Sequence, residues 1–484
     1  MRLNEYVKFD ATGLASLVNS GEVASTELTQ LAREAYEQIN PSINAVIEFY
    51  DDAEAVGAAD AGPFNGVPFL RKDIGPTEAG RLQEMGSRLF KGNRPQIESF
   101  FFRRARDAGL RIVGRTATTE FGTSGMSESM LHGVTRNPWD LTRTTGGSSA
   151  GAAAAVAAGI TPIAHGGDGG GSIRVPASWC GLVGLNPSRG RISGGPNNQD
   201  GSFGMSRPFV LCRTVRDMAA ALDVFSGPHP GDPFIIAQPI RPYTQELSQA
   251  TGSLRVGVAR TKWGAVDIEP QILHALESTA SLLIELGHSV VDIKPPYAST
   301  EYITVLLAGW CFTSRWLEAA AREIGRNIDA DTIEEINLRL YSTGRDREKT
   351  GAYELHEALR KMRFAVGEAT QGFDILLTPT MPAVAPQPGG IYSTTNPTLS
   401  AEEYLAADAA LYQFLGVFNV TGQPSVSLPL AQSDDGLPIG LQIVGRFGDE
   451  ATLVRVARDL EEANPWSYRR PGGAVASCRC VREV

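Results

Sequence analysis

Two glycine-rich loops, each with a serine, hold the residues of this sequence best suited to chemistry. The first covers residues 146–151 and includes Ser148, and the second covers residues 166–174 and includes Ser172. The stretch between them is expected to form an alanine-rich helix and a short apolar strand, which would bring Ser172 back beside Ser148. A serine hydroxyl is a poor nucleophile unless an adjacent base takes its proton. The two loops therefore raise the question of where a base could come from.

The residues that precede Ser172 favour an anion-binding loop. They are three consecutive glycines: Gly169, Gly170 and Gly171. Glycine backbone lets successive N–H groups converge on one point, and such a nest beside a nucleophile stabilises an oxyanion. The same glycines would also suit an ordinary mobile turn, and Ser148 and Ser149 would suit the N-cap of the following helix. From these residues alone both interpretations stay open.

Three familiar motifs do not account for the loops. A phosphate-binding P-loop needs a lysine after its last glycine, and residues 141–205 contain none. A dinucleotide fingerprint would need glycine where Ser172 stands. Residues 147–151 match G-x-S-x-G with Ser149 at the centre, but that elbow must follow a buried strand, and residues 137–143 are polar and contain proline. The sequence therefore indicates neither a nucleotide site nor a hydrolase elbow.

Lysine is scarce, and this draws attention to Lys72. The chain has seven lysines against 37 arginines, and Lys72 follows the apolar run of residues 66–70. Lysine loses its proton when it is desolvated, whereas arginine effectively does not. His165 lies closer to Ser172 in sequence but ends an apparent strand and has no obvious acid partner, so we expect it to support the site rather than react.

These motifs resemble those of the amidase signature family, and the resemblance extends along nearly the whole chain in the same order. The segments that match are residues 67–73, 136–140, 146–151, 166–174, 422–424 and 436–442. The resemblance implies a Ser–cisSer–Lys triad made of Ser172, Ser148 and Lys72. It also implies an α/β fold, a single large domain with a mixed, mainly parallel central β-sheet covered by helices on both faces.

The resemblance further implies a mechanism. Neutral Lys72 would deprotonate Ser148, which would relay the proton from Ser172 as Ser172 attacks the carbonyl carbon and forms an acyl-enzyme. Burial would have to lower the pKa of Lys72 from its usual ~10.4. The remaining residues implied for the site are the oxyanion-hole N–H groups of Gly169, Gly170, Gly171 and Ser172, and the loop supports Asp168, Arg174 and Ser149. For Asp168 and Arg174 the alternative is a surface ion pair.

The substrate is expected to be a small-molecule amide, hydrophobic, cyclic or aryl, with carbamates and esters as further possibilities. Residues 226–232 and 465–471 resemble a bacterial subgroup of the family that hydrolyses a cyclic amide. The residues proposed for the substrate pocket are Trp310, Cys311, Phe312 and Trp316, for which a helix core is the alternative. Two other functions stay open: the glutamine-hydrolysing amidotransferase subunit of a tRNA-dependent complex, and a non-enzymatic anion-binding module.

Apolar periodicity predicts the elements that would position these residues. Helices are expected at residues 11–38, 97–109, 149–158, 270–286 and 449–462, with more helix across 300–370. Strands are expected at residues 110–114, 160–165, 254–259, 289–293, 373–377, 425–428 and 440–444. Strands that alternate with helices indicate an α/β sheet with parallel neighbours. Residues 382–390 are rich in proline and glycine and are expected to form a loop or lid.

The expected organisation is one amidase domain over residues 1–470. It comprises an N-terminal helical segment at 1–60, a catalytic core with both loops at 61–250 and a variable helical segment on the substrate side at 300–370. Residues 471–484 are expected to be a flexible tail, and Cys478 and Cys480 within it are a weak hint of metal binding.

Charge and composition restrict the partners. The formal net charge of −10 and the absence of a basic stripe argue against nucleic acid. No run reaches the ~18 apolar residues of a membrane span, and five scattered cysteines suit a reducing cytoplasm. The histidines show no metal-ligand spacing. We therefore expect a cytoplasmic enzyme that needs no metal or other cofactor, with a homodimer as a possible assembly.

Overall fold

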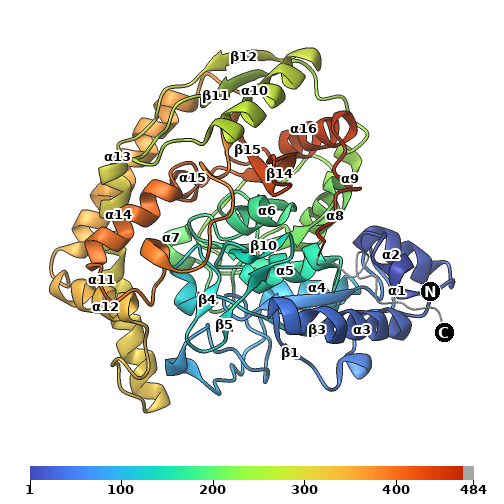
Figure 1. Ribbon diagram of the computed structural model, residues 1–484, viewed down its shortest axis with the longest axis horizontal. Coiled ribbons are helices and arrows are strands. Elements are labelled where there is room, and N and C mark those ends of the chain that lie inside the picture. The colour runs from blue at the N-terminus through green and yellow to red at the C-terminus, as the bar shows by residue number, and fades with distance from the viewer. Residues whose placement is uncertain (473–484) are drawn as a thin grey trace.

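An eleven-stranded mixed sheet runs through the centre of the molecule (Figure 1), and the structure describes residues 1–472. From one edge to the other its strands are β1 (Val46–Phe49), β3 (Arg111–Thr116), β2 (Pro68–Lys72), β8 (Ile163–Asp168), β10 (Arg207–Cys212), β9 (Val183–Asn186), β14 (Ser425–Gln432), β15 (Pro438–Gly445), β13 (Ile375–Pro379), β11 (Arg255–Val258) and β12 (Ser289–Asp292). Two small ribbons lie outside it: β4 (Glu128–Ser129) with β5 (Gly133–Val134), and β6 (Arg136–Asn137) with β7 (Asp140–Thr144).

Parallel and antiparallel pairs occupy different parts of this sheet. The parallel pairs lie on its two flanks, where β2 pairs with β3 and β8, and β11 pairs with β12 and β13. The centre, from β8 through β10, β9, β14 and β15 to β13, is antiparallel throughout. The mixed sheet of the prediction is confirmed, and the parallel character expected from alternating strands and helices is restricted to the flanks.

Helices cover both faces of the sheet. Helices α5 and α6 contact it mainly through β8, β9, β14 and β15, and helices α8, α10 and α16 contact it mainly through β10, β12, β13, β14 and β15. The helices of the first half of the chain are α1 (Leu3–Tyr6), α2 (Ala11–Asn19), α3 (Ser25–Ile43), α4 (Phe100–Asp107), α5 (Ala150–Ala158), α6 (Arg174–Cys180), α7 (Gly201–Gly204), α8 (Val215–Phe225) and α9 (Tyr243–Glu246). Those of the second half are α10 (Pro270–Glu285), α11 (Ser299–Ile324), α12 (Glu335–Asp346), α13 (Gly351–Thr370), α14 (Ala401–Leu411), α15 (Gly416–Thr421) and α16 (Glu450–Ala463).

The segment 300–370 is helical, as predicted. Helix α11 packs along α12 and α13, and α14 closes the group against α11 and α12. These helices, in yellow and orange, form the left-hand side of Figure 1 beside the loops that carry the predicted site. Of residues 382–390, predicted as a loop or lid, 382–389 contain no helix or strand, and a 3-10 helix begins at Gly390.

The N-terminal helix predicted over residues 11–38 is two helices. Gly21, with a φ of +75°, lies between α2 and α3 and gives the chain a turn that L side chains rarely adopt. Pro41, where the helix was expected to stop, lies inside the last turn of α3, and Asn44 ends the helix in the left-handed conformation. Asn40 then accepts hydrogen bonds from the N–H groups of residues 45 and 46, which leads directly into β1.

The alanine-rich helix α5 is buried along its whole length. All nine of its residues are inaccessible to solvent or nearly so. Small side chains let it lie close to its neighbours, and a Cβ at Gly151 would come within 2.1 Å of the Ala45 carbonyl oxygen. This close packing fixes the position of the N-terminal end of α5, where Ser148 and Ser149 lie.

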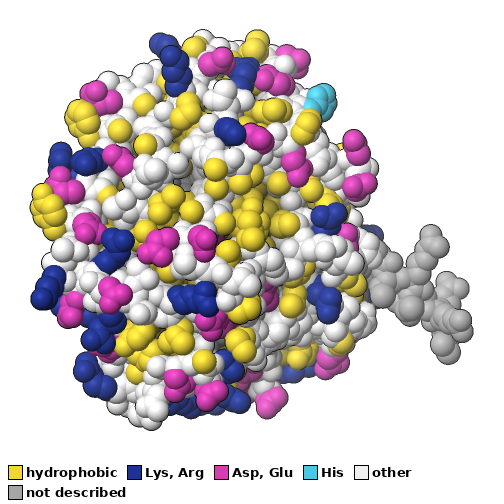
Figure 2. All heavy atoms as spheres, turned by 60° about the vertical axis from the view of Figure 1, so that its left-hand side comes forward, with side chains coloured by type: hydrophobic (Ala, Val, Ile, Leu, Met, Phe, Trp, Pro, Cys, Tyr) yellow, Lys and Arg dark blue, Asp and Glu magenta, His cyan; other side chains and the backbone are white. Residues whose placement is uncertain are grey.

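The predicted tail, residues 471–484, lies almost entirely outside the described residues, which end at 472. Cys478 and Cys480 also lie outside them. Among the described residues, no helix is long and apolar enough to cross a membrane. Figure 2 shows basic and acidic side chains interspersed on the face that it presents, with no continuous basic stripe there.

Candidate active site

Lys72 and the second glycine loop are positioned by two neighbouring parallel strands. Lys72 is the last residue of β2, and Asp168 is the last residue of β8. The pairing of β2 with β8 places the carboxyl ends of both strands at one edge of the sheet. Helix α5 ends at residue 158, close to the start of β8, and it packs along that strand. The N-terminus of α5 therefore lies near the carboxyl end of β8, at the same edge of the sheet.

Lys72 and Ser148 are in direct contact. Lys72 Nζ donates a hydrogen bond to Ser148 Oγ at 2.7 Å and another to the Gly167 carbonyl at 3.3 Å. Both side chains are 2% exposed. Burial lowers the pKa of Lys72 to about 7, while the negative charge of Asp168 opposes this shift. Lys72 can therefore be neutral near pH 7, as a proton acceptor must be.

The two glycine loops are joined through Ser149. Its N–H donates to the Ser172 carbonyl at 3.2 Å, and its Oγ accepts from the Gly167 N–H at 3.2 Å. Its hydroxyl also donates to the Gly167 carbonyl at 3.3 Å. Ser149 occupies the N-cap of α5 but makes no side-chain capping bond, and Ser148 is bonded to Lys72 instead. Neither hydroxyl therefore caps helix α5.

Residues 169–172 present backbone donors with no partner. Among the described residues, none accepts a hydrogen bond from the N–H groups of Gly169, Gly170, Gly171 or Ser172. Gly171 has a φ of +143°, and a Cβ there would come within 2.8 Å of Leu415. Gly169 is exposed, and Gly170 and Ser172 are partly exposed, so these donors are open to a ligand.

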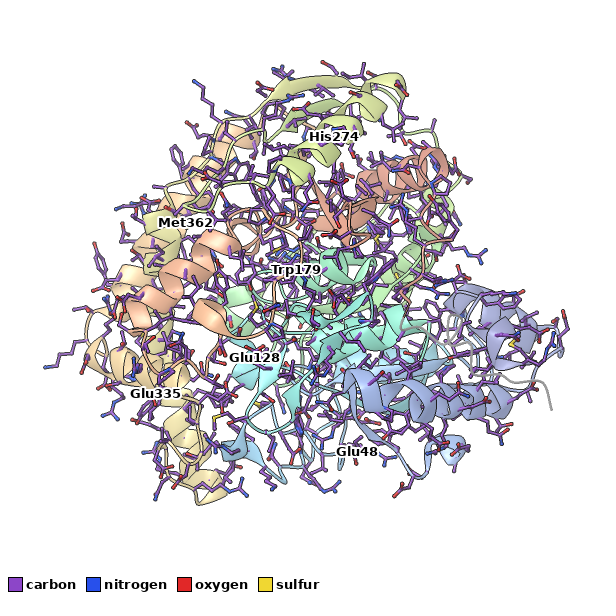
Figure 3. The ribbon with its side chains drawn as sticks, viewed as in Figure 1. Glu48, Glu128, Trp179, His274, Glu335 and Met362 are labelled. Carbon is purple, nitrogen blue, oxygen red and sulfur yellow. The ribbon has the colours of Figure 1, made fainter. Side chains whose placement is uncertain are left out.

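Tight packing also holds the first loop. A Cβ at Gly146 would come within 2.8 Å of the indole of Trp179, which lies on α6 near the centre of the molecule (Figure 3). A Cβ at Gly147 would meet the Met126 carbonyl oxygen at 1.9 Å. The peptide bond between Gly147 and Ser148 is cis. The glycines of this loop are thus required by their neighbours.

Asp168 and Arg174 form a fully buried ion pair at 2.9 Å, not a surface one. Asp168 also accepts hydrogen bonds from the N–H groups of Ile173 and Arg174, which close the loop onto the start of α6. Burial alone would raise the pKa of Asp168, but the charge and hydrogen bonds of Arg174 hold it well below its usual range. The pair therefore braces the second glycine loop.

The C-terminal part of the chain completes this bracing. Arg174 donates to Gln442 Oε1 on β15 at 2.8 Å and to Ser425 Oγ on β14 at 3.1 Å. Asn419 of α15 donates to Asp168 Oδ1 at 2.9 Å and to the Asp168 carbonyl at 3.0 Å. The role of Asn419 was not predicted, because a single asparagine in an apolar stretch carries no spacing signal.

His165 lies beneath Lys72. Its Nδ1 accepts a hydrogen bond from the Lys72 backbone N–H at 3.2 Å, and the rings of Phe101 and Phe102 pack against it. Burial, together with the charges of Lys72 and Arg71, holds the pKa of His165 well below its usual value. A neutral, enclosed imidazole agrees with a supporting role.

The four residues proposed for the substrate pocket separate into two groups. Trp310 and Cys311 are buried, and they pack against Gly344 of α12 and Gly351 of α13. The structure does not place these two at an open surface. Phe312 and Trp316 are 41% and 44% exposed, so they remain the two of the four that a substrate could reach.

Aromatic side chains surround these two exposed residues. Trp316 stacks on Phe90 with ring centroids 5.4 Å apart and meets Phe121 edge-on. Phe121 directly precedes Gly122, where a Cβ would lie 3.1 Å from Ser148 Oγ. Phe312 meets Phe203 edge-on at 4.7 Å. Trp316 is thus connected through Phe121 to the loop beside Ser148, whereas Phe312 contacts α7.

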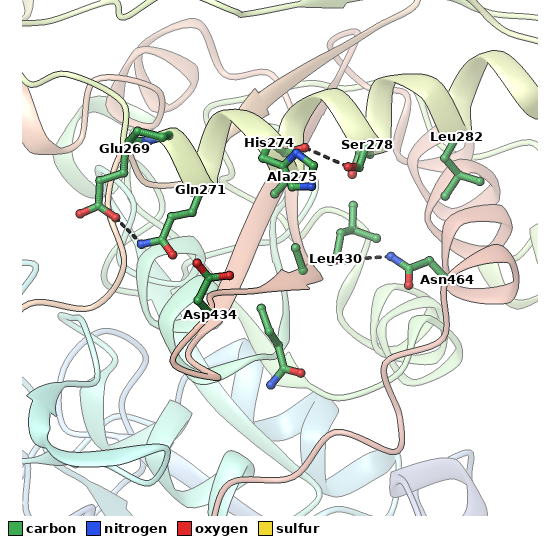
Figure 4. Close-up of a pocket in the computed structure, with 13 residues that line it drawn as sticks. Glu269, Gln271, His274, Ala275, Ser278, Leu282, Leu430, Asp434 and Asn464 are labelled. Carbon is green, nitrogen blue, oxygen red and sulfur yellow. Dashed lines mark hydrogen bonds between the residues drawn. The ribbon is translucent and has the colours of Figure 1, made fainter.

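Two other candidate sites, a cavity and a cluster of possible metal ligands, include none of the predicted catalytic residues. A cavity of about 820 Å³ (Figure 4) lies between α10, the end of β14 and the end of α16, lined among others by His274, Leu430 and Asn464, and includes none of the predicted catalytic residues. The described residues contain one cluster with metal-ligand spacing, Asp73, Glu84 and His132. Arg115 Nη1 lies 3.0 Å from Asp73 and 2.8 Å from Glu84, so one guanidinium already forms ion pairs with both carboxylates.

The comparisons with known proteins agree with this geometry. Residues 27–454 match the Amidase family, so the chain belongs to the amidase signature family and is an enzyme that hydrolyses carbon–nitrogen bonds. It is 38% identical to the 6-aminohexanoate-cyclic-dimer hydrolase of Paenarthrobacter ureafaciens over 476 residues, 96% of either chain. A solved structure of 6-aminohexanoate cyclic dimer hydrolase superimposes with a TM-score of 0.90 at 36% identity, covering 96% of this chain and 99% of the other. A bacterial aryl acylamidase structure gives 0.83 at 26% identity, covering 95% and 97%.

Proposed function

We propose that this chain is a serine amidase in which Ser172 is the nucleophile, Ser148 the proton relay and Lys72 the general base. The observation that carries the proposal is the 2.7 Å contact between Lys72 Nζ and Ser148 Oγ in a buried site where the lysine pKa is about 7. The bond from Ser149 N–H to the Ser172 carbonyl supports the third member of the triad, because it holds the loop of Ser172 against that of Ser148.

The reaction follows from the proton positions. Neutral Lys72 takes the proton of Ser148, and Ser148 takes the proton of Ser172 as Ser172 Oγ bonds to the carbonyl carbon. The carbonyl π electrons move to oxygen, which the N–H groups of residues 169–172 stabilise. When the oxyanion collapses, the C–N bond breaks and the leaving nitrogen receives the proton through Ser148. Water then attacks the acyl-enzyme by the same route and releases the acid.

The proposed substrates are hydrophobic, cyclic or aryl amides. Two similar proteins are named for a cyclic amide dimer and for aryl acylamides, and the exposed aromatic residues Phe312 and Trp316 suit an apolar group. Carbamates and esters of matched shape would react through the same acyl-enzyme. The alternative of a glutamine-hydrolysing amidotransferase subunit predicts turnover of glutamine by the pure chain or after addition of partner subunits.

The test is a substrate panel with the wild type and Ser172→Ala. The panel contains aryl, cyclic and alkyl amides, glutamine, and carbamates and esters of the same shape. We expect amide turnover that Ser172→Ala abolishes and that Ser248→Ala, a change at an exposed serine, leaves intact. A fluorophosphonate should label the wild type at Ser172, located by mass spectrometry. Full activity of Ser172→Ala would overturn the nucleophile assignment.

A further inference from the structure

One face of α14 turns polar side chains toward the loop beside the catalytic serine. Tyr404, Asp408 and Tyr412 are spaced four residues apart at and just after this helix, so they lie on one side of it. The Tyr404 hydroxyl donates to the Thr123 carbonyl at 3.2 Å. A Cβ at neighbouring Gly122 would lie 3.1 Å from Ser148 Oγ. The face of α14 is therefore connected to the catalytic loop through residues 122–126.

Tyr412 packs directly on that loop. A Cβ at Gly125 would lie only 1.9 Å from the Tyr412 hydroxyl oxygen, so the phenol covers the glycine. Tyr302 of α11 brings its hydroxyl to within 3.2 Å of where a Cβ of Gly170 would be. Burial raises the pKa of Tyr302, and the negative charges of Asp408 and Asp168 raise it further. The helix face and the oxyanion loop thus border the same region.

Asp408 and Tyr412 each have a buried polar atom without a partner. No described residue forms a hydrogen bond with Asp408 Oδ1 or with the Tyr412 hydroxyl, although solvent does not reach either atom. Asp408 also forms no ion pair with any described lysine, arginine or histidine. An unpaired buried polar atom costs free energy, so a site that keeps two of them side by side suits a ligand that satisfies both.

Asp408 has no cationic partner among the described residues, and this indicates the chemistry of the ligand. Burial raises the pKa of the Asp408 carboxyl well above its usual value. A protonated carboxyl has one O–H to donate and one carbonyl oxygen to accept. A secondary amide offers one acceptor and one N–H, so the two groups match without any change of charge. An ammonium group would instead require Asp408 to ionise in a region lined by phenols.

We propose that Asp408 and Tyr412 form a specificity subsite that binds a second, unreactive amide group of the substrate through hydrogen bonds. The proposal rests on the proposed function, since the scissile amide must lie at Ser172. It defines the substrate class as compounds with two amide groups separated by an apolar chain. Asp408 acts here as a binding group and takes no part in the proton transfers.

Three p-nitroanilides of equal scissile chemistry test this subsite. The acyl groups are 6-acetamidohexanoyl, which has the second amide, nonanoyl, which replaces it with methylenes at equal chain length, and 6-aminohexanoyl, which carries an ammonium. The variants are Asp408→Leu, Asp408→Asn, Tyr412→Phe, and Glu402→Gln as the matched control at an exposed position of the same helix. The measured quantity is the ratio of kcat/KM for the acetamido compound to that for the nonanoyl compound.

We expect Asp408→Leu to lower this ratio about tenfold or more, because the distal amide loses its partner. Asp408→Asn, which keeps a donor and an acceptor, should retain most of the ratio, Tyr412→Phe should lower it, and Glu402→Gln should not change it. An unchanged ratio in Asp408→Leu would overturn the proposal. Preference for the amino compound that Asp408→Asn abolishes would overturn it too, in favour of a carboxylate–ammonium site.

Binding separates this proposal from the proposed function. The dissociation constant of 6-acetamidohexanamide is measured by calorimetry in Ser172→Ala, with and without Asp408→Leu. A weakening of about tenfold supports the subsite whether or not the anilides turn over, and equal constants contradict it. Failure of the proposed function would appear differently, as no hydrolysis of the nonanoyl anilide by a folded wild type. Melting temperatures of all variants exclude a loss of fold.

Discussion

His165 Nδ1 accepts a hydrogen bond from the backbone N–H of Lys72 at 3.2 Å. The end of β2 is therefore fixed by a neutral ring enclosed by Phe101 and Phe102, while the lysine side chain points to Ser148. An imidazole without charge anchors the backbone of the lysine and adds no repulsion to its protonated form. The proposed base is thus held by hydrogen bonds at its backbone N–H and at its side-chain nitrogen, Nζ.

Replacing Lys72 by arginine should abolish activity. Arginine keeps the positive charge but effectively does not release a proton, and loss of a general base typically costs 10²–10⁴ in rate. We expect kcat to fall by about a thousandfold for the best amide of the panel. Lys91→Arg, a change at an exposed lysine, is the matched control and should be as active as wild type. An active Lys72→Arg enzyme would exclude a neutral lysine as the base.

The pH profile of kcat/KM should rise with an apparent pKa near 7. Lys72 accepts a proton only when neutral, and burial lowers its pKa to about 7. The same group makes stability depend on pH. Between about 7 and ~10.4 the unfolded chain binds a proton at Lys72 that the folded chain does not, so the free energy of unfolding rises with pH across this window.

Chemical denaturation at several pH values measures the stability effect. The unfolding free energy of the wild type minus that of Lys72→Met should increase from pH 7 to pH 10 and be constant below pH 6. A flat difference would mean that the pKa of the buried lysine is not lowered.

Replacing Asp168 by asparagine should affect both stability and the pH profile. The change leaves Arg174 buried without its counter-charge, and breaking such a pair typically costs about 3–5 kcal/mol. It also removes the negative charge that raises the pKa of Lys72, so the acid limb of the profile should move below 7. Asp140→Asn on the surface ribbon is the control, and it should change neither quantity. An acid limb that does not move would show that the charge of Asp168 does not affect the pKa of the base.

Trp316 and Trp310 should respond in opposite ways to replacement by alanine. Trp316 is 44% exposed, so Trp316→Ala should raise KM for aryl amides several-fold and change the melting temperature little. Trp310 is buried among α11 and α12, so Trp310→Ala should cost about 3–5 kcal/mol of stability. Urea denaturation and steady-state kinetics measure the two effects. Equal KM values for wild type and Trp316→Ala would remove this residue from the pocket.

The residues with distinctive chemistry and the supports that lie near them in sequence, such as Asp168, Arg174 and Ser149, could be predicted from the sequence, whereas the supports from distant segments could not. Lys72 stood out because lysine is scarce, and Ser148 and Ser172 stood out because glycines surround them. Asn419 gave no such signal, since its partner Asp168 lies 251 residues away along the chain. Asp408 gave none either, because a single aspartate in a helix carries no spacing signal. Their roles depend on which strands and helices become neighbours, and local spacing carries no information about that.

Helix geometry explains why the proposed pocket residues separated. Consecutive residues on a helix point about 100° apart, so a run such as Trp310 to Phe312 cannot face one side. The aromatic composition of this segment indicated a pocket, but only the packing of α12 and α13 decides which side of α11 remains open. Likewise, the apolar spacing of residues 11–38 continues across Gly21, where the backbone turns.

The contacts of Arg174 with Ser425 and Gln442 link the active site to the order in which the chain is made. The proposed oxyanion loop is complete in sequence after residue 174, yet two of its anchors lie on the last two central strands, about 250 residues later. A ribosome-bound chain that has not yet released β15 has both serines, the lysine and the Asp168–Arg174 pair, but lacks the anchor at Gln442. Full activity should therefore appear only when synthesis is almost finished.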